Sequence, residues 1–201
     1  MNHKRFILNA NDFGMSKAFN RAVLEGYESG LLRSVSLVAN GNAFDDATNR
    51  VIPYCPELGI GIHLNITEGK SITSGLNLLT NETGVFNNSW LKILFKTLND
   101  KDNLFIEQVE KEFRAQIEKI QKKSYITHLD SHNYIHALPK IFELVCKLAN
   151  EFGIEYVKTP YEKPYIVPDV FIHLNLKYFI NLTKLVLLDL LTLINENKIE
   201  K

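Results

Sequence analysis

Three of the chain's six histidines, His128, His132 and His136, lie in the single segment 127–136, which reads THLDSHNYIH. Imidazole is the commonest protein ligand for metal ions, and it also takes up and releases protons near neutral pH. Such a concentration of histidines therefore indicates a metal-assisted active site. If that interpretation is correct, other segments of the chain must supply the remaining ligands.

The overall composition narrows the class of protein. The chain has 201 residues, of which 45% are hydrophobic and 23% are charged, so we expect one globular domain spanning residues 1–201. Basic and acidic residues balance at 23 each, and no basic block is present, which argues against a nucleic-acid partner. The two cysteines, Cys55 and Cys146, form no CxxC motif and are too few for a disulfide framework, which favours a reducing cytoplasm.

Neither export nor a membrane partner is expected. The N-terminus begins MNHKR and continues with about five apolar residues, which is too short for the apolar core of a signal peptide. The most apolar stretch runs from Leu185 to Ile194 and contains Asp189, and it has about half of the roughly 20 residues that a membrane-spanning helix needs. We interpret it as a buried helix in preference to a helix on a membrane surface.

Short apolar runs alternate with segments of helical periodicity, a pattern typical of an α/β fold with parallel strands. Strands are expected near residues 6–8, 35–38, 58–64, 125–129 and 154–157. Helices are expected at 16–30, 43–51, 104–122 and 139–153, followed by an apolar helix that ends near residue 195. The polar stretch 65–103 is long for a connection and is interpreted as a lid or an insertion.

Three polar positions fall where the expected strands end. Asp12 ends the first strand, His63 ends the third, and His132 lies just past the fourth. In parallel α/β folds, ligands gather at the carboxyl ends of the strands. One aspartate and two histidines would form a facial set for a divalent cation and leave positions open for water and substrate. The competing interpretations are that Asp12 is a turn or capping residue and that His63 is a hydrogen-bonded core histidine.

The other histidines carry weaker signals. His132 and His136 are four residues apart and would share a face on a helix, but Pro139 places the helix start after them, so the geometry of the pair stays open. His128 lies inside the expected strand and is interpreted as structural. His3 and His173 carry no signal.

Three segments together resemble the signature motifs of the YdjC-like carbohydrate deacetylases, also called chitooligosaccharide deacetylases. They are residues 9–16 (NANDFGMS), 61–65 (GIHLN) and 127–136. The resemblance runs in order from about residue 5 to residue 164. It implies a (β/α)-barrel-like fold and metal-dependent hydrolysis of the N-acetyl group of an acetylated amino sugar, such as a chitobiose-type oligosaccharide.

The resemblance also implies roles for individual residues. Asp12, His63 and His132 would bind Mg²⁺ or Zn²⁺, and the ion would polarise the acetamide carbonyl and lower the pKa of the attacking water. Substrate contacts are expected from His136, Asn65 and Trp90. Trp90 and Phe86 could stack against a pyranose ring, although the alternative, that both anchor a long loop to the core, is the stronger one.

Two departures from the family pattern bear on activity. The first motif usually carries two adjacent aspartates, and the first of them serves as the general base; here that position is Asn11. A carboxamide cannot accept a proton at neutral pH, so the expected base is missing. Lys158 stands where similar sequences often carry an arginine, as a partner position for the catalytic carboxylate.

The second departure is length, because family members generally continue for several more βα units and a further histidine segment. Five strands do not close the usual barrel, so the sheet is expected to stay open, to be covered by the final helix, or to be completed by another subunit in a homo-oligomer. Three hypotheses stay open. They are a deacetylase of impaired activity, a non-catalytic sugar-binding or regulatory protein that keeps the metal site, and a truncated or substrate-trapping variant.

Overall fold

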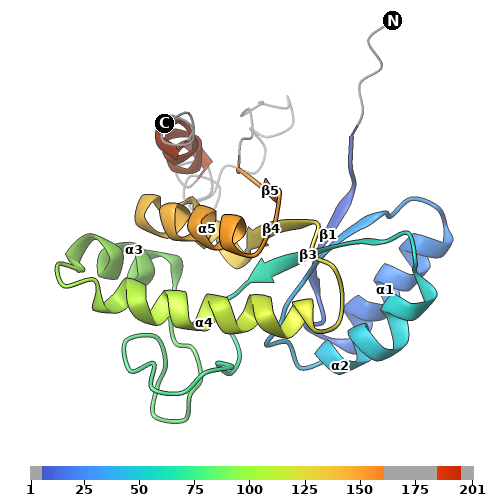
Figure 1. Cartoon of the computed structure of the whole chain (residues 1–201), viewed down its shortest axis with the longest axis horizontal. Coiled ribbons are helices and arrows are strands. Elements are labelled where there is room, and N and C mark those ends of the chain that lie inside the picture. Colours follow the sequence, from blue (N-terminus) through green and yellow to red (C-terminus); the bar gives the residue numbers. More distant parts are fainter. Residues whose placement is uncertain (1–5, 161–184, 196–201) are drawn as a thin grey trace, which may run out of the picture.

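The computed structural model describes residues 6–160 and 185–195 of the chain. Within them, five parallel strands form one sheet in the order of the sequence, with helices in the connections (Figure 1). The strands are β1 (Asn9–Phe13), β2 (Ser34–Leu37), β3 (Gly59–Leu64), β4 (His128–Ser131) and β5 (Tyr156–Val157). This sequential order is that of an incomplete barrel, so the expected α/β, barrel-like fold is confirmed.

Apart from α3, the helices lie where the periodicity predicts them. They are α1 (Lys17–Glu28), α2 (Phe44–Asp46) with its continuing turns Ala47–Val51 and Ile52–Tyr54, α3 (Trp90–Asn99), α4 (Leu104–Gln121), α5 (Pro139–Glu151) and a helix at 185–195. Ser16 starts α1, since its Oγ accepts a hydrogen bond from the Phe19 amide at 3.2 Å. Pro139 occupies the first turn of α5, where its missing N–H costs nothing.

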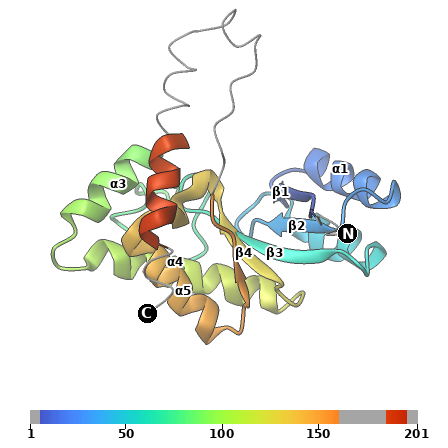
Figure 2. The same cartoon turned by 90° about the horizontal axis from the view of Figure 1, so that it is seen from above.

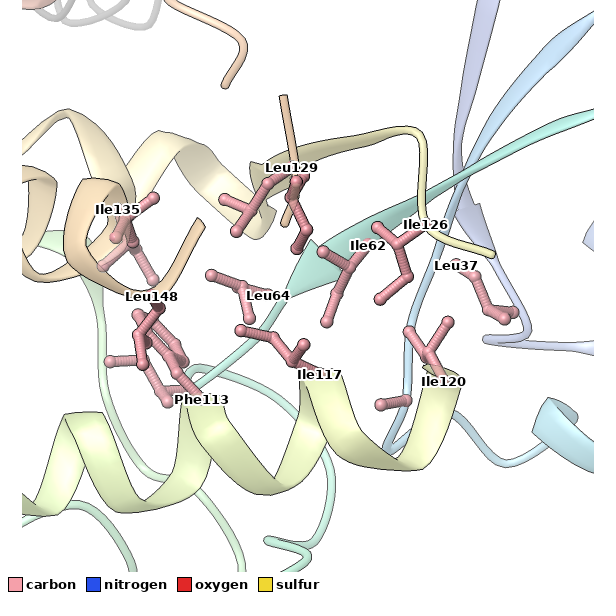
Figure 3. Close-up of a cluster of buried hydrophobic side chains, with 14 of the residues drawn as sticks. Leu37, Ile62, Leu64, Phe113, Ile117, Ile120, Ile126, Leu129, Ile135 and Leu148 are labelled. Atoms are coloured by element: carbon pink, nitrogen blue, oxygen red, sulfur yellow. The ribbon is translucent and has the colours of Figure 1, made fainter. Parts of the chain in front are cut away.

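The core lies between the helices and one face of the sheet. In Figure 3, Phe113, Ile117 and Ile120 on α4 point toward Ile62 and Leu64 on β3, and all five side chains are fully buried. Their spacing of three and four residues puts the α4 side chains on one face of the helix, and the two β3 residues share one face of the strand. This packing fixes β3, and therefore His63 between Ile62 and Leu64, against the rest of the molecule.

The opposite face of the sheet is polar. Along it the strand register pairs Asn9 with Ser34 and His63 with Asp130. Gly61 lies beside His128, and a Cβ atom at Gly61 would overlap the His128 ring, so glycine leaves the space that the imidazole fills. Side chains alternate between the two faces of a strand, which is why polar and apolar residues alternate here.

The first strand and the fourth strand lie later in the sequence than predicted. Phe6 and Ile7 precede β1 and are exposed, and β1 instead contains the segment NANDF. The apolar-run criterion fails there because one face of β1 belongs to the polar side of the sheet. Similarly, β4 begins at His128, not at Tyr125.

The stretch 65–103 contains a helix that the sequence pattern did not predict. α3 begins at Trp90 after Ser89, whose Oγ accepts a hydrogen bond from the Lys92 amide at 3.3 Å. Apolar residues occur on both its buried and its exposed sides, with Leu91, Phe95 and Leu98 facing outward, and this blurs the helical pattern. The rest of the stretch is loop, as expected.

The helix at 185–195 is half-buried and packs near the start of α5 (red in Figure 2). Leu188 and Leu191 are buried, and the Asn195 side-chain amide donates a hydrogen bond to the Ala137 carbonyl at 2.9 Å. The part of the expected apolar helix before residue 185 lies outside the described residues. Among the helices that are described, none combines the length and the apolar character needed to span a bilayer.

Candidate metal centre

A β-bulge at the end of β1 places Asp12. Ala10 pairs with Val35 and Phe13 pairs with Leu37, so Asn11 and Asp12 together lie opposite one residue of β2. Asp12 has a φ of 61°, a left-handed conformation that aspartate adopts more readily than most residues. Bulges re-aim side chains and are frequent beside active sites.

Asp12, His63 and His132 come together at the carboxyl ends of β1, β3 and β4. Each offers one ligand atom, and these atoms all lie within 4.8 Å of one another. The Asp12 Oδ1 atom is 3.1 Å from His132 Nδ1 and 3.5 Å from His63 Nε2. The two imidazole rings are nearly perpendicular, with their centroids 5.5 Å apart. One carboxylate and two imidazoles at these distances could hold a divalent metal ion.

The hydrogen bond and the opposite charges of Asp12 and His132 shift both pKa values against the effect of burial. The hydrogen bond from His132, helped by the positive charges of His63 and His132, lowers the pKa of Asp12 even though partial burial opposes this shift. The same bond, together with the negative charges of Asp12 and Glu68, raises the pKa of His132 against the effect of burial. Without a metal ion, the pair is therefore stabilised as carboxylate and imidazolium.

Asp130 orients His63 from the opposite side of its ring. The Asp130 Oδ1 atom lies 2.6 Å from His63 Nδ1, so the Nε2 atom is the one that faces Asp12. Burial raises the pKa of Asp130, but hydrogen bonds from His63 and Ser36 and the charges of His63 and Lys158 outweigh it and hold that pKa low. A buried carboxylate behind a ligand histidine fixes the tautomer of the ring. The sequence alone does not single out Asp130; the available signal is that it alternates with His128 on the polar face of β4.

Ser36 links the polar face of the sheet to this carboxylate. Its hydroxyl donates to Asp130 Oδ2 at 2.9 Å, accepts from the Asn9 side-chain amide at 2.9 Å, and lies 3.2 Å from His128 Nε2. Burial lowers the pKa of His128. The expectation that His128 is structural agrees with this position, since its ring bridges two strands and lies outside the Asp–His–His cluster.

His136 does not join that cluster. It is fully buried, its Nε2 atom lies 2.6 Å from the Lys158 carbonyl, and its Nδ1 atom lies 2.6 Å from the Ser131 hydroxyl. A carbonyl only accepts, so Nε2 carries the proton and Nδ1 accepts from Ser131. His136 thereby connects the end of β4 to the segment after β5. A direct contact with substrate stays a prediction.

The buried His136 makes stability depend on pH. Burial lowers its pKa to about 4, from a usual value of 6.5, so the folded state binds fewer protons than the unfolded state between these values. Its contribution to stability is complete above pH 6.5 and is lost as the pH falls toward 4, at up to about 1.4 kcal/mol per pH unit. Urea unfolding of the wild type and of His136→Gln across this range should show a shallower slope in the variant. Parallel slopes would contradict the assignment.

Asn11 and Lys158, the two positions expected to differ from the family pattern, both lie near the cluster. Asn11 is exposed beside Asp12, and its Oδ1 accepts a hydrogen bond from the Asn9 side chain at 2.9 Å. The Lys158 Nζ atom lies 3.9 Å from Asp130 Oδ2. Among the carboxylates of the described residues, Lys158 therefore approaches Asp130.

Asn65 and Trp90 occupy buried or partly buried positions. Asn65 is 1% exposed, and its side-chain oxygen accepts hydrogen bonds from the Thr67 amide and hydroxyl and from the Glu68 amide. Trp90 packs against the core, and Phe86 is buried. Both positions agree with the alternative that these residues anchor a long loop to the core. Contacts of these residues with a sugar stay predictions.

Comparison with known proteins identifies the family. The family model described as "YdjC-like protein" matches residues 5–188. The chain belongs to the YdjC-like family. A carbohydrate deacetylase of Clostridium beijerinckii is 33% identical to this YdjC-like chain over 164 residues, covering 80% of the chain and 63% of that protein. One from Listeria monocytogenes serotype 4b is 38% identical over 151 residues, covering 75% and 59% respectively.

A solved structure supports the barrel-like interpretation. A protein of Enterococcus faecalis V583, whose name links it to cellobiose-phosphate cleavage, matches the YdjC-like chain with a TM-score of 0.64 and 26% identity. The match covers 75% of this chain and 57% of that protein. The chain thus spans less than two thirds of the length of these relatives.

Proposed function

We propose that this YdjC-like chain is a metal-dependent hydrolase that removes the N-acetyl group from acetylated amino sugars, with chitobiose-type oligosaccharides as the model substrate. One observation carries the proposal: Asp12, His63 and His132 converge at the carboxyl ends of the strands, in a chain whose relatives are named carbohydrate deacetylases. The ion would be Mg²⁺ or Zn²⁺, since a donor set of one carboxylate and two imidazoles suits several divalent cations.

The residues present fit a bound metal ion. Asp130 holds the far nitrogen of His63, and Asp12 is ionised in the pair with His132. The side chains of Asp12 and His132 are 30% and 17% exposed, so water and substrate can reach the cluster. When bound, the ion would supply Lewis acidity toward the acetamide carbonyl and toward water.

The chain's own groups then have separable roles. Asp12, His63 and His132 would hold the ion, and Asp130 keeps His63 in the tautomer whose Nε2 atom faces the cluster. Hydrolysis forms a bond between water oxygen and the acetyl carbon and breaks the C–N bond, which gives acetate and the free amine. The water proton needs an acceptor and the departing nitrogen needs a donor. The Asn11 side chain cannot act as that acceptor.

Asn11 favours a second candidate function. A chain that binds metal and sugar without a general base would serve as a non-catalytic sugar-binding or regulatory protein. Such a protein would bind N,N′-diacetylchitobiose with the same dependence on Asp12, His63 and His132 but would release no acetate.

Acetate release from N,N′-diacetylchitobiose, with Mg²⁺ or Zn²⁺ added, tests the proposal. We expect slow release that is lost in His63→Ala and kept in Glu82→Ala, which alters an exposed residue of the 65–88 loop. Metal-dependent sugar binding without acetate would favour the non-catalytic function. A wild-type chain that binds no divalent metal would overturn both.

A further inference from the structure

Glu68, in the loop after β3, approaches the far side of the His132 ring. The Glu68 Oε1 atom lies 3.5 Å from His132 Nε2, while His132 Nδ1 lies 3.1 Å from Asp12. His132 is thus placed between two carboxylates, with Asp12 inside the candidate metal cluster and Glu68 outside it.

His63 also lies between two carboxylates, but with its two ring nitrogens exchanged. Asp130 contacts the Nδ1 atom of His63, so Nε2 faces the cluster. A carboxylate that accepts a hydrogen bond from the N–H of one imidazole nitrogen keeps the proton there and leaves the other nitrogen free to bind metal. By the same chemistry, a carboxylate at Nε2 of His132 selects Nδ1 as the nitrogen that faces the cluster.

The backbone of Glu68 is held in place by one half-buried and one buried asparagine. Its carbonyl accepts hydrogen bonds from the side-chain amides of Asn40 and Asn65, at 3.0 and 2.9 Å. Gln116 on α4 is fully buried and holds the backbone of Asn65. Its side chain accepts a hydrogen bond from the Asn65 backbone N–H at 2.9 Å and donates one to the Asn65 backbone carbonyl at 2.7 Å. The loop is therefore anchored to the core helix, although the Glu68 side chain itself is 57% exposed.

We propose that Glu68 is a positioning residue of the metal centre: it accepts a hydrogen bond from the Nε2–H group of His132, which keeps the proton on Nε2 and leaves Nδ1 of that ring for the metal. The two histidines then bind through different nitrogens, Nε2 of His63 and Nδ1 of His132. This inference rests on the proposed metal site, and it adds a residue outside the Asp–His–His set.

Metal affinity, measured by calorimetric titration of the full chain with Zn²⁺, tests the proposal. We expect Glu68→Ala to weaken binding by about 10–100-fold, as is usual for residues that orient metal ligands. Glu68→Gln keeps a neutral acceptor and should weaken binding less. Equal losses in both variants would mean that Glu68 acts only through its charge, and would overturn the proposal. Glu82→Ala, in the same loop, is the matched control and should bind as the wild type does.

A second readout reports the nitrogen directly. Long-range ¹H–¹⁵N spectra of the zinc-bound chain should show His132 protonated at Nε2 and His63 protonated at Nδ1. A His132 bound through Nε2, or unchanged affinity in Glu68→Ala, would overturn the role of Glu68 while leaving the metal site intact. A wild type that binds no zinc would instead overturn the metal site and, with it, this inference.

Discussion

Replacing Asn11 by aspartate should raise the rate of acetate release from N,N′-diacetylchitobiose by about 10²–10⁴-fold, the usual contribution of a general base. Position 11 lies beside Asp12 in the β-bulge and is exposed, so the new carboxylate needs no burial. The Asn9 side-chain amide, which now donates to Asn11 Oδ1 at 2.9 Å, can donate to an aspartate in the same place. The substitution therefore adds a proton acceptor without disturbing the local structure.

Initial rates at saturating Zn²⁺ or Mg²⁺ measure this gain. Asn11→Ala is the matched control, since it changes the same position without adding a base and should leave the rate within a few-fold of the wild type. If the aspartate form binds metal and sugar but stays as slow as the wild type, the limiting group lies elsewhere. The non-catalytic function would then be the better interpretation.

The face of the sheet that packs against the helices is predictable from the sequence, because its buried residues are apolar and recur at strand or helix spacing. Ile60, Ile62 and Leu64 alternate along β3, and α4 repeats apolar residues at helical spacing. The polar half of the sheet carries no such pattern. The apolar run at residues 6–8 predicts the first strand too early in the sequence, and this run is exposed. The residues of β1 itself, NANDF, form a strand with a polar face and therefore give no apolar signal.

The candidate site divides in the same way. Asp12, His63 and His132 could be selected because each falls at the end of an expected strand and because the motifs resemble a known family. The role of Asp130 and the proposed role of Glu68 could not be predicted, since each depends on which histidine nitrogen the carboxylate approaches in space. A sequence shows that Asp130 and His132 are two residues apart, but Asp130 contacts His63, which is 67 positions away.

Removing the Asp130 carboxylate should destabilise the fold by roughly 2–6 kcal/mol, because it leaves two buried hydrogen-bonding groups without their acceptor. The side chains of His63 and Asp130 are 4% and 2% exposed, so both ends of the contact are almost fully buried. In Asp130→Ala, the Nδ1 side of His63 and the Ser36 hydroxyl both lose their carboxylate partner. Each unsatisfied buried group costs about 1–3 kcal/mol.

Urea unfolding at pH 7 measures this loss, and two variants calibrate it. Asp130→Asn keeps an oxygen and an amide in the same volume and should cost less than Asp130→Ala. Asp102→Ala removes an exposed aspartate and should change the unfolding free energy by no more than about 0.5 kcal/mol. An Asp130→Ala chain as stable as the Asp102→Ala chain would show that the His63–Asp130 contact contributes nothing.

The pH dependence of the same experiment separates charge from packing. The folded-state pKa of Asp130 is below its usual value of 3.8, so its charge contributes stability that is present above that value and lost as the pH falls through the folded pKa. The difference in stability between the wild type and Asp130→Ala should therefore narrow as the pH falls below about 4. A difference that stays constant through this range would mean that the aspartate stabilises the fold by filling space, and that its charge does not hold His63 in place.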